Sequence, residues 1–311
     1  MTVTSSTRPG GGRRARFAAL LERPDDAGLR GAAVAAARSE AAARDLAVEA
    51  DRAWPRLSRA ERDLLGYHVR AAGVALALER ATQSLLPARR ARAAAAIGEL
   101  RLSEASPRLA EMLHDRNRWA GIAAARALGR IGSPFAAHAL LEALEAGLVP
   151  EQRLVEALGG AWAEEPLLAA FRAPRTVALR VPLADALGHT GAPAAAEALT
   201  AAMPAASVDL RVRIVRALAR LGRPEPVRAA MSDPHERVRA QAAWALGRLG
   251  DEQASELLEA AMIDSAPRVR ANSAAALRRL GDRRGQSPRR GDCPHYASSS
   301  SSSVTSMSRM R

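Results

Sequence analysis

The sequence contains no lysine, and all 46 of its basic residues are arginine. This exclusive use of arginine, beside so much alanine and glycine, indicates a biased coding composition of a bacterial kind. It weakens the formal net charge of +13 as a sign of nucleic-acid binding. Residues 86–281 hold 26 arginines against 21 acidic residues, which is a net charge of +5. Charge alone therefore does not imply a general phosphate-binding surface.

Cysteine and long apolar runs are also scarce. The single Cys293 excludes an internal disulfide framework and fits a reducing compartment, so we expect a cytoplasmic protein. No apolar run reaches the roughly 18 residues of a membrane-spanning helix, and the stretch 17–21 is too short for the core of a signal peptide. We expect no membrane span in this sequence, and the basic start at Arg13 leaves open that an anchor precedes it.

Aromatic residues make up only 3% of the chain, whereas 48% of its residues are hydrophobic. Alanine supplies most of that apolar fraction. Because alanine is the best helix former and lets helix axes approach closely, this composition predicts an all-α protein with a thin core of alanine and leucine.

A motif of the form Ala-Leu-Gly-x-Leu-Gly recurs seven times between residues 86 and 281. Its third residue serves as a marker position, and the markers are Gly98, Gly129, Gly159, Gly188, Ala219, Gly247 and Arg278. The steps between them are 31, 30, 29, 31, 28 and 31 residues. A fixed period of this length predicts a stacked array of one supersecondary unit, so function is expected on a surface rather than in a globular core.

Glycine and proline divide each repeat into two helices. Gly132, Gly191 and Gly222 are each followed two residues later by a proline. Glycine suits the left-handed end of one helix and proline suits the first turn of the next. We expect four regions: a disordered N-terminus (1–16), a helical capping region (17–85), an array of about seven repeats (86–281) and a disordered tail rich in arginine and serine (282–311).

Two local patterns define the capping region. Residues 26–52 hold no proline and predict one long helix. Ser58 with Glu61 matches a capping box, and residues 71–86 predict a further helix that completes an atypical capping pair.

The segments 233–247 and 264–277 resemble HEAT repeats of the short, phycobilisome-lyase-like kind. The resemblance implies a right-handed α-α superhelix that acts mainly as a scaffold. It also implies a structural ladder between repeats, for which Asp233 with Arg239 and Asp264 with Arg270 match the family pattern. Arg213 and Arg118 match that pattern less completely. The repeat that follows Gly159 departs from the pattern, which predicts altered curvature there.

Catalytic constellations are sparse. The six histidines fall at different offsets within the repeats. Deoxyhypusine hydroxylases with HEAT-like repeats use four His-Glu pairs to hold two irons, whereas this sequence has only His235-Glu236, where Glu236 suits a helix N-terminus. No residue identifies a bilin pocket. We expect no catalytic residue, metal or cofactor, and a bilin-lyase-like chaperone or a HEAT-type oxidoreductase is a weaker alternative.

Residues three before and one after each marker share one exposed face of the second helix, because residues four apart are neighbours on a helix. The resemblance implies that this face lines the concave side of the array. The middle of that face carries Glu156 and Asp185. Its last repeats carry Arg216, Arg220, Trp244, Arg248 and Arg279. These five residues and Arg213 are the predicted partner-binding residues.

Arginine around tryptophan is typical of an interaction hot spot. We therefore predict a non-enzymatic scaffold that binds a protein partner with an acidic surface through the concave face. Two alternatives remain open: Trp244 is partly buried packing beside solvated arginines, or the face binds nucleic acid, as in HEAT-like alkylpurine DNA glycosylases. The oligomeric state also remains open.

Overall fold

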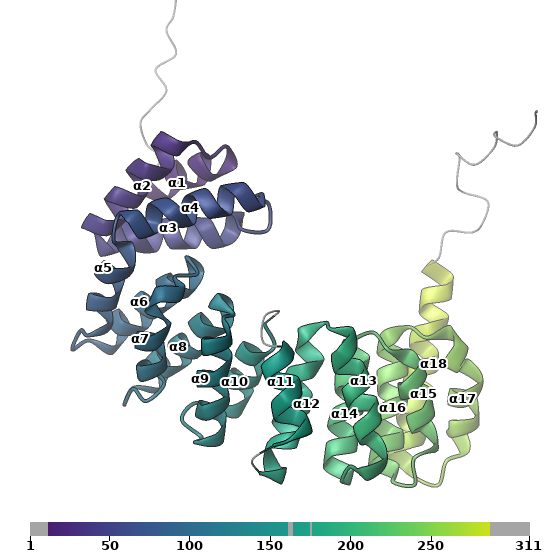
Figure 1. The fold of residues 1–311 in the computed structure, drawn as a ribbon. Coiled ribbons are helices and arrows are strands. Elements are labelled where there is room, and N and C mark those ends of the chain that lie inside the picture. The colour runs from purple at the N-terminus through teal and green to yellow at the C-terminus, as the bar shows by residue number, and fades with distance from the viewer. Residues whose placement is uncertain (1–11, 161–163, 175, 287–311) are drawn as a thin grey trace, which may run out of the picture.

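The computed structural model describes residues 12–160, 164–174 and 176–286, with side chains up to residue 281. In these residues all regular structure is helical, which confirms the all-α class (Figure 1). An N-terminal bundle comes first. It consists of α1 (Arg13–Glu22), α2 (Asp26–Arg38), α3 (Glu40–Ala53) and α4 (Arg59–Ala71).

Helical pairs then follow one another along the chain. Their first helices are α5 (Val74–Thr82), α7 (Ser106–Met112), α9 (Pro134–Glu145), α11 (Glu164–Arg172), α13 (Pro193–Ala202), α15 (Pro224–Ala229) and α17 (Ser255–Ala260). Their second helices are α6 (Pro87–Glu99), α8 (Arg118–Ile131), α10 (Glu151–Leu158), α12 (Arg180–Thr190), α14 (Val208–Arg220), α16 (Glu236–Leu249) and α18 (Pro267–Gln286). The prediction of two helices per repeat is confirmed.

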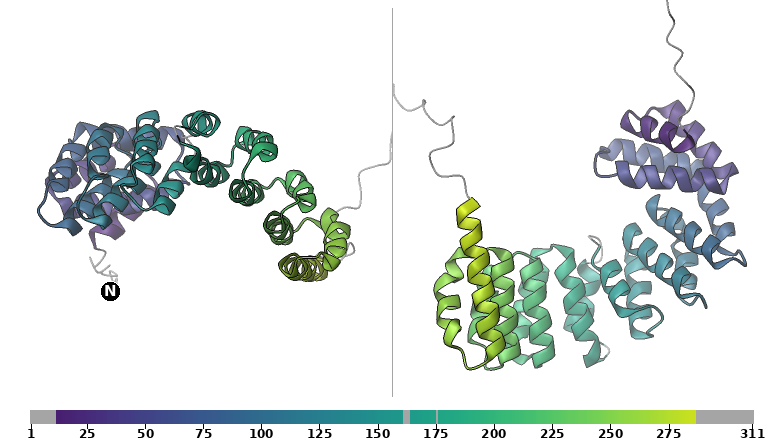
Figure 2. Two further views of the ribbon diagram at one scale, coloured as in Figure 1. Left: turned by 90° about the horizontal axis from the view of Figure 1, so that it is seen from below. Right: turned by 180° about the vertical axis from the view of Figure 1, so that it is seen from behind.

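The second helices pack directly on one another in a row, and the first helices form the other row. Figure 2 shows that the row of α12, α14 and α16 lies on the inner side of the curve of the solenoid. The punctuation is also as predicted: Gly132 and Gly191 end helices with φ of 64° and 72°, and Pro134 and Pro193 begin the next ones.

Marker glycines allow the inner helices to touch through their backbones. A Cβ atom on Gly98, Gly188 or Gly247 would lie 2.5, 2.7 or 2.6 Å from the Cα atom of an alanine in the next inner helix. Those alanines, Ala127, Ala217 and Ala276, are the first residues of the next copies of the motif. The leucine between alanine and glycine is fully buried in the copies that contain Leu128, Leu158, Leu187 and Leu246. At these junctions the motif therefore fastens one repeat to the following one.

The N-terminal bundle differs from the prediction in one place. The prediction of a single helix over residues 26–52 was wrong, because the helix is interrupted at Ser39, whose backbone is extended. The Ser39 hydroxyl accepts a hydrogen bond from the Ala42 N–H and starts α3, so α2 and α3 pack side by side. The capping box is confirmed: the Ser58 N–H donates to the Glu61 carboxylate at 2.7 Å.

Helices occupy part of both segments that the sequence analysis predicted to be disordered. Helix α1 begins at Arg13, inside the segment 1–16, and α18 continues past Gly281 to Gln286. Residues 1–11 and 287–311 of those two predictions lie outside the described residues.

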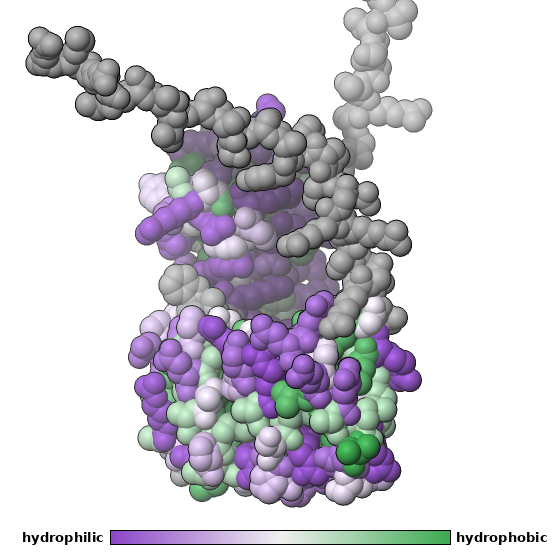
Figure 3. Space-filling view, turned by 90° about the vertical axis from the view of Figure 1, so that its right-hand side faces the viewer, coloured by the Kyte–Doolittle hydropathy of each residue, from purple (hydrophilic) through white to green (hydrophobic). Residues whose placement is uncertain are grey.

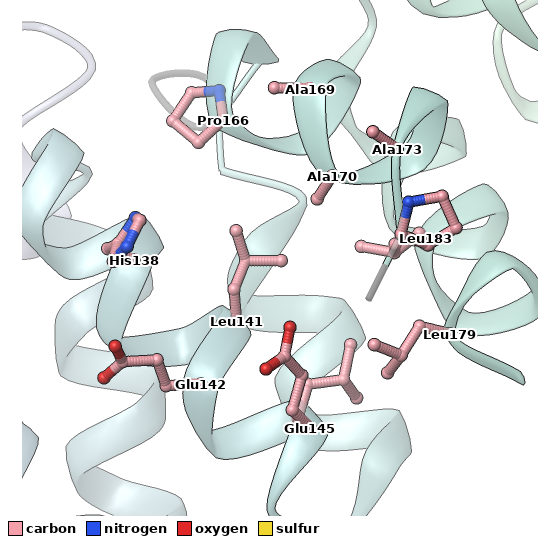
Figure 4. A pocket seen from close by; sticks show the side chains of 12 residues that line it. His138, Leu141, Glu142, Glu145, Pro166, Ala169, Ala170, Ala173, Leu179 and Leu183 are labelled. Carbon is pink, nitrogen blue, oxygen red and sulfur yellow. The ribbon is translucent and has the colours of Figure 1, made fainter. Parts of the chain in front are cut away.

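The array is irregular beyond Gly159, where the sequence departs from the pattern. Helix α10 ends at Leu158, and the outer helices α9 and α11 enclose an apolar hollow of about 290 Å³ with Leu183 of α12. Figure 4 shows Leu141 and Leu179 beside this hollow, with Glu142 and Glu145 near it. None of the predicted site residues lines this hollow.

Candidate functional site

Four of the predicted concave residues line one hollow between α14 and α16. The hollow has a volume of about 320 Å³, and its lining residues are Arg216, Ala219, Arg220, Trp244, Arg248 and Leu249. We call it the Trp244 hollow. Ala219 stands at the marker position, where most other repeats have glycine. Counting three residues before and one after each marker thus identifies residues up to 32 positions apart, Arg216 and Arg248, that lie together in the fold.

Trp244 offers an aromatic surface with a cation already on it. The indole is partly buried against the core, and the Arg248 guanidinium carbon lies 4.9 Å from its ring centroid. This is the geometry of a cation–π contact. It holds Arg248 over the ring at the edge of the hollow.

Asp185 is a counter-ion inside the arginine cluster. The expectation that Asp185 lies exposed in the groove was wrong, because only 7% of the residue is exposed. Its carboxylate pairs with Arg213 at 2.6 Å and with Arg220 at 3.1 Å, both on the neighbouring α14. Asp185 therefore neutralises part of the positive charge that the sequence places at this site.

Arg216 lies on α14 between the two arginines that Asp185 holds. It forms no ion pair with another residue that the structure describes. Burial, and then the positive charge of Arg213, lower the pKa of the Arg216 guanidinium. The negative charge of Asp185 offsets this lowering only in part, so an incoming anion would further stabilise the charged form of Arg216.

Two predicted residues lie outside the hollow. Arg213 is connected to it only through Asp185, and Arg279 is exposed on α18. His189 of α12 lies close enough to Arg220 for their charges to interact. Burial, followed by the positive charge of Arg220, lowers the pKa of the His189 imidazole, so the imidazole is neutral near pH 7.

The N-terminal half of the concave surface is balanced by its own acids. A second hollow of about 540 Å³ is lined by residues from the same two predicted positions, including Glu99, Arg126 and Glu156. Arg130 in that hollow pairs with Asp51 of the N-terminal bundle at 3.1 Å and with Glu99 at 3.3 Å. Sequence spacing gave no signal for Asp51, since it comes from outside the array. The excess of positive charge therefore lies at the Trp244 hollow.

The structural ladder joins arginines to aspartates of the following repeat. Arg239 holds Asp264 through two hydrogen bonds of 2.8 and 3.0 Å. Asp233 is held in the same way by Arg211, which takes the place that the sequence analysis gave to Arg213. The contact between Arg239 and Asp233 is made with the backbone carbonyl of Asp233, at 2.9 Å.

Sequence reasoning missed one rung near the start of the array. Arg90 holds Asp115 through hydrogen bonds of 2.7 and 2.8 Å, and its Nη1 donates to the Ser84 carbonyl. Arg118, named as an incomplete match, is an exposed residue at the start of α8. The signal for Arg90 was available, because it lies eight residues before its marker, as Arg239 does.

His235 has a structural role at the start of α16. It precedes α16, and its Nδ1 accepts a hydrogen bond from the Arg237 N–H at 3.2 Å. Within residues 12–160, 164–174 and 176–281 no three His, Cys, Asp or Glu side chains are grouped so that they could hold a metal ion. In the same part of the chain, no helix combines the length and apolarity that crossing a bilayer requires.

Comparison with protein families agrees with this architecture. A profile described as HEAT repeats matches residues 74–159 and 198–278. The chain belongs to the HEAT-repeat family. The first HEAT match includes α5, which the sequence analysis had placed in the capping region, and the interval between the two matches contains the irregular region that follows Gly159.

Solved structures with similar helical arrays are distant. Human deoxyhypusine hydroxylase in complex with glycerol is 20% identical over 78% of this chain and 98% of its own, with a TM-score of 0.35. The complex of CpcE and CpcF of phycocyanin lyase from Nostoc sp. PCC7120 is 22% identical over 67% and 87%, with a TM-score of 0.35. An engineered protein is 17% identical over 67% and 96%, with a TM-score of 0.33. No curated protein matches the chain.

Proposed function

We propose that this HEAT-repeat protein is a non-enzymatic interaction scaffold that binds an acidic segment of a partner protein in the Trp244 hollow. HEAT solenoids commonly mediate protein interactions. The observation that carries the proposal is the convergence of Arg216, Arg220, Trp244 and Arg248 on one concave hollow.

The composition of the hollow favours a carboxylate beside an apolar side chain. Arg216 supplies a positive charge that forms no direct ion pair among the described residues and that Asp185 offsets only in part. A guanidinium binds a carboxylate through two parallel hydrogen bonds. The indole of Trp244 supplies an apolar contact next to that charge. Tryptophan and arginine together are the residue types that most often dominate the binding free energy of interfaces.

A pair of labelled peptides tests the proposal directly. One peptide alternates Glu and Leu, and its control replaces every Glu by Gln. We expect the acidic peptide to bind the full chain and the amide control to bind much less, as measured by fluorescence anisotropy. Trp244→Ala and Arg216→Ala should each weaken binding of the acidic peptide by about tenfold, which corresponds to about 1.4 kcal/mol.

Arg223→Ala is the matched control, because Arg223 is an exposed arginine of the array outside the Trp244 hollow. Its affinity for the acidic peptide should equal that of the wild type. Unchanged binding in both Trp244→Ala and Arg216→Ala would rule out the hollow as the binding site. If the hollow binds the acidic peptide, affinity capture with mass spectrometry, comparing the wild type with Arg248→Glu, would identify the natural partner.

Nucleic acid is the second candidate, since a concave arginine cluster can also contact phosphates. Asp185 argues against it, because its single negative charge pairs with both Arg213 and Arg220 and lowers the net positive charge of the cluster by one. Mixed duplex DNA in the same anisotropy assay separates the two candidates: tight binding that falls steeply with salt would favour nucleic acid. We also propose that the protein is cytoplasmic, because a single cysteine favours a reducing compartment.

A further inference from the structure

The C-terminal end of the array exposes a repeat interface that is covered in the preceding repeat. Met231 is 9% exposed, whereas Met262, 31 residues later, is 41% exposed. Ala240 is 2% exposed and packs against Ala266 and Val269 of the last repeat, whereas its counterpart Ala271 is exposed. Figure 3 faces this end and shows green, apolar side chains among purple, hydrophilic ones.

Arg270 repeats the geometry of the ladder arginines at this end. Its Nη1 donates to the backbone carbonyls of Asp264 and Ser265 at 2.7 and 3.0 Å, as Arg239 does with Asp233 and Pro234. In Arg239 the remaining Nε and Nη2 hold the next aspartate. In Arg270 these two donors have no partner among the residues that the structure describes.

Arg278 occupies the marker position of the last repeat. Gly247 at the same position of α16 lets Ala276 approach its backbone, whereas Arg278 is an exposed side chain on α18. A further copy of this repeat would therefore meet a bulky cation where it needs a glycine. Arg270 and Arg278 lie eight residues apart, about 12 Å along the helix.

We propose that this end face binds a helical hairpin of a partner protein. The turn of that hairpin carries an aspartate that Arg270 holds as Arg239 holds Asp264, and its second helix carries a carboxylate opposite Arg278. The apolar part of the hairpin covers Ala271 and Met262. This surface is separate from the Trp244 hollow, and the two can be occupied independently.

Charge complementarity favours such a partner over the alternatives. A second copy of this chain would bring its own Arg270 and Arg278 against the same two arginines. The residues that follow α18 carry four arginines and one aspartate between residues 287 and 311, so they offer little negative charge. An acidic hairpin complements both cations.

The last repeat itself provides the probe. A labelled peptide with the sequence of residues 251–281 is stapled on its exposed faces, its helicity is checked by circular dichroism, and Ala276→Glu places a carboxylate opposite Arg278. A second peptide also carries Asp264→Asn. We expect the first to bind the full chain and the second to bind about tenfold more weakly, since one bidentate carboxylate–guanidinium pair is lost.

Variants of the full chain complete a double-mutant cycle. Arg270→Ala should weaken the first peptide about tenfold and leave the second unchanged. Arg278→Glu, an exposed substitution that should not disturb folding, should also weaken the first peptide. Trp244→Ala and Arg223→Ala should have no effect, which separates this surface from the proposed concave site.

Three results would overturn the proposal. The first is equal affinity of the two peptides, or no binding by either up to about 1 mM. The second is self-association in sedimentation equilibrium that Arg270→Ala abolishes, because it would make a second copy the occupant. The third is a gain in peptide affinity when the chain is cut after Gln286, because it would assign the surface to the chain's own end.

Discussion

Arg239 and Asp264 join two consecutive repeats through one planar pair of hydrogen bonds, Nε to Oδ2 at 2.8 Å and Nη2 to Oδ1 at 3.0 Å. Asp264 also accepts the Ala266 N–H at 2.8 Å, which fixes the turn before α18. Each rung thus orders a turn and fastens the neighbouring repeat at the same time. The two side chains are only 17% and 13% exposed, so solvent screens the pair weakly.

Removing one partner of this rung should destabilise the protein. We expect Arg239→Ala to lower the free energy of unfolding by about 2 kcal/mol, because Asp264 is left partly buried without its cation. Urea unfolding followed by circular dichroism measures the change. Arg237→Ala is the control, since the Arg237–Asp209 pair is 52% and 69% exposed and should contribute little. Equal losses in the two variants would contradict the structural importance of the ladder.

The free energy of unfolding should decrease at acidic pH, because the aspartates of these Arg–Asp pairs become protonated. The hydrogen bonds from Arg90 and Arg239 lower the pKa values of the Asp115 and Asp264 carboxyls in the folded state. Their contribution is therefore complete above the unfolded pKa of about 3.9 and is lost as the pH falls through the lower folded value. Urea midpoints between about pH 6 and pH 3 should drop less steeply in the Arg90→Ala, Arg239→Ala double variant than in the wild type. Parallel curves would exclude these carboxyls as the cause.

The marker glycine should not tolerate even a methyl group where inner helices touch. Gly247→Ala places a Cβ atom 2.6 Å from the Cα atom of Ala276, so α16 and α18 must separate. We expect a loss of about 1–3 kcal/mol despite the better helix propensity of alanine. Gly281→Ala is the matched control, because a Cβ atom there has nothing within 4 Å, and it should be neutral or stabilising. Thermal unfolding of both variants decides the matter, and a stable Gly247→Ala would refute the close-contact argument.

Asp185 should tune the affinity of the concave site. Asp185→Asn removes the counter-ion of Arg213 and Arg220, so the Trp244 hollow gains one net positive charge. We expect a few-fold tighter binding of the Glu-Leu peptide, a stronger dependence on salt and a lower melting temperature. Glu156→Gln, which changes an exposed carboxylate of the other hollow, should leave the affinity unchanged. Weaker binding by Asp185→Asn would mean that the acid orders the site rather than shielding it.

The repeat period predicted the helical architecture and the composition of the Trp244 hollow. Counting from each marker is enough to place Arg216, Arg220, Trp244 and Arg248 on one face, because regular helices stack at a constant step. Counting does not give the direction of a long side chain. For this reason Asp185 proved to be buried between two arginines, and Arg211 took the ladder position expected for Arg213.

Other differences come from outside the period. The break at Ser39 depends on one hydroxyl that caps α3, in a stretch whose composition otherwise favours an uninterrupted helix. Asp51, which pairs with Arg130, belongs to the bundle and has no repeat register at all. Contacts between the bundle and the array therefore cannot be predicted from the repeat period.

Backbone contact at the marker positions also has a mechanical consequence. Where inner helices meet through a glycine and one alanine methyl, no rotamers are available that could repack when the solenoid is bent. We infer that these junctions resist bending more than junctions packed through long side chains do. The junction at Ala219 lacks the glycine and opens beside the Trp244 hollow, so an occupant of that hollow acts on a joint of different stiffness from its neighbours.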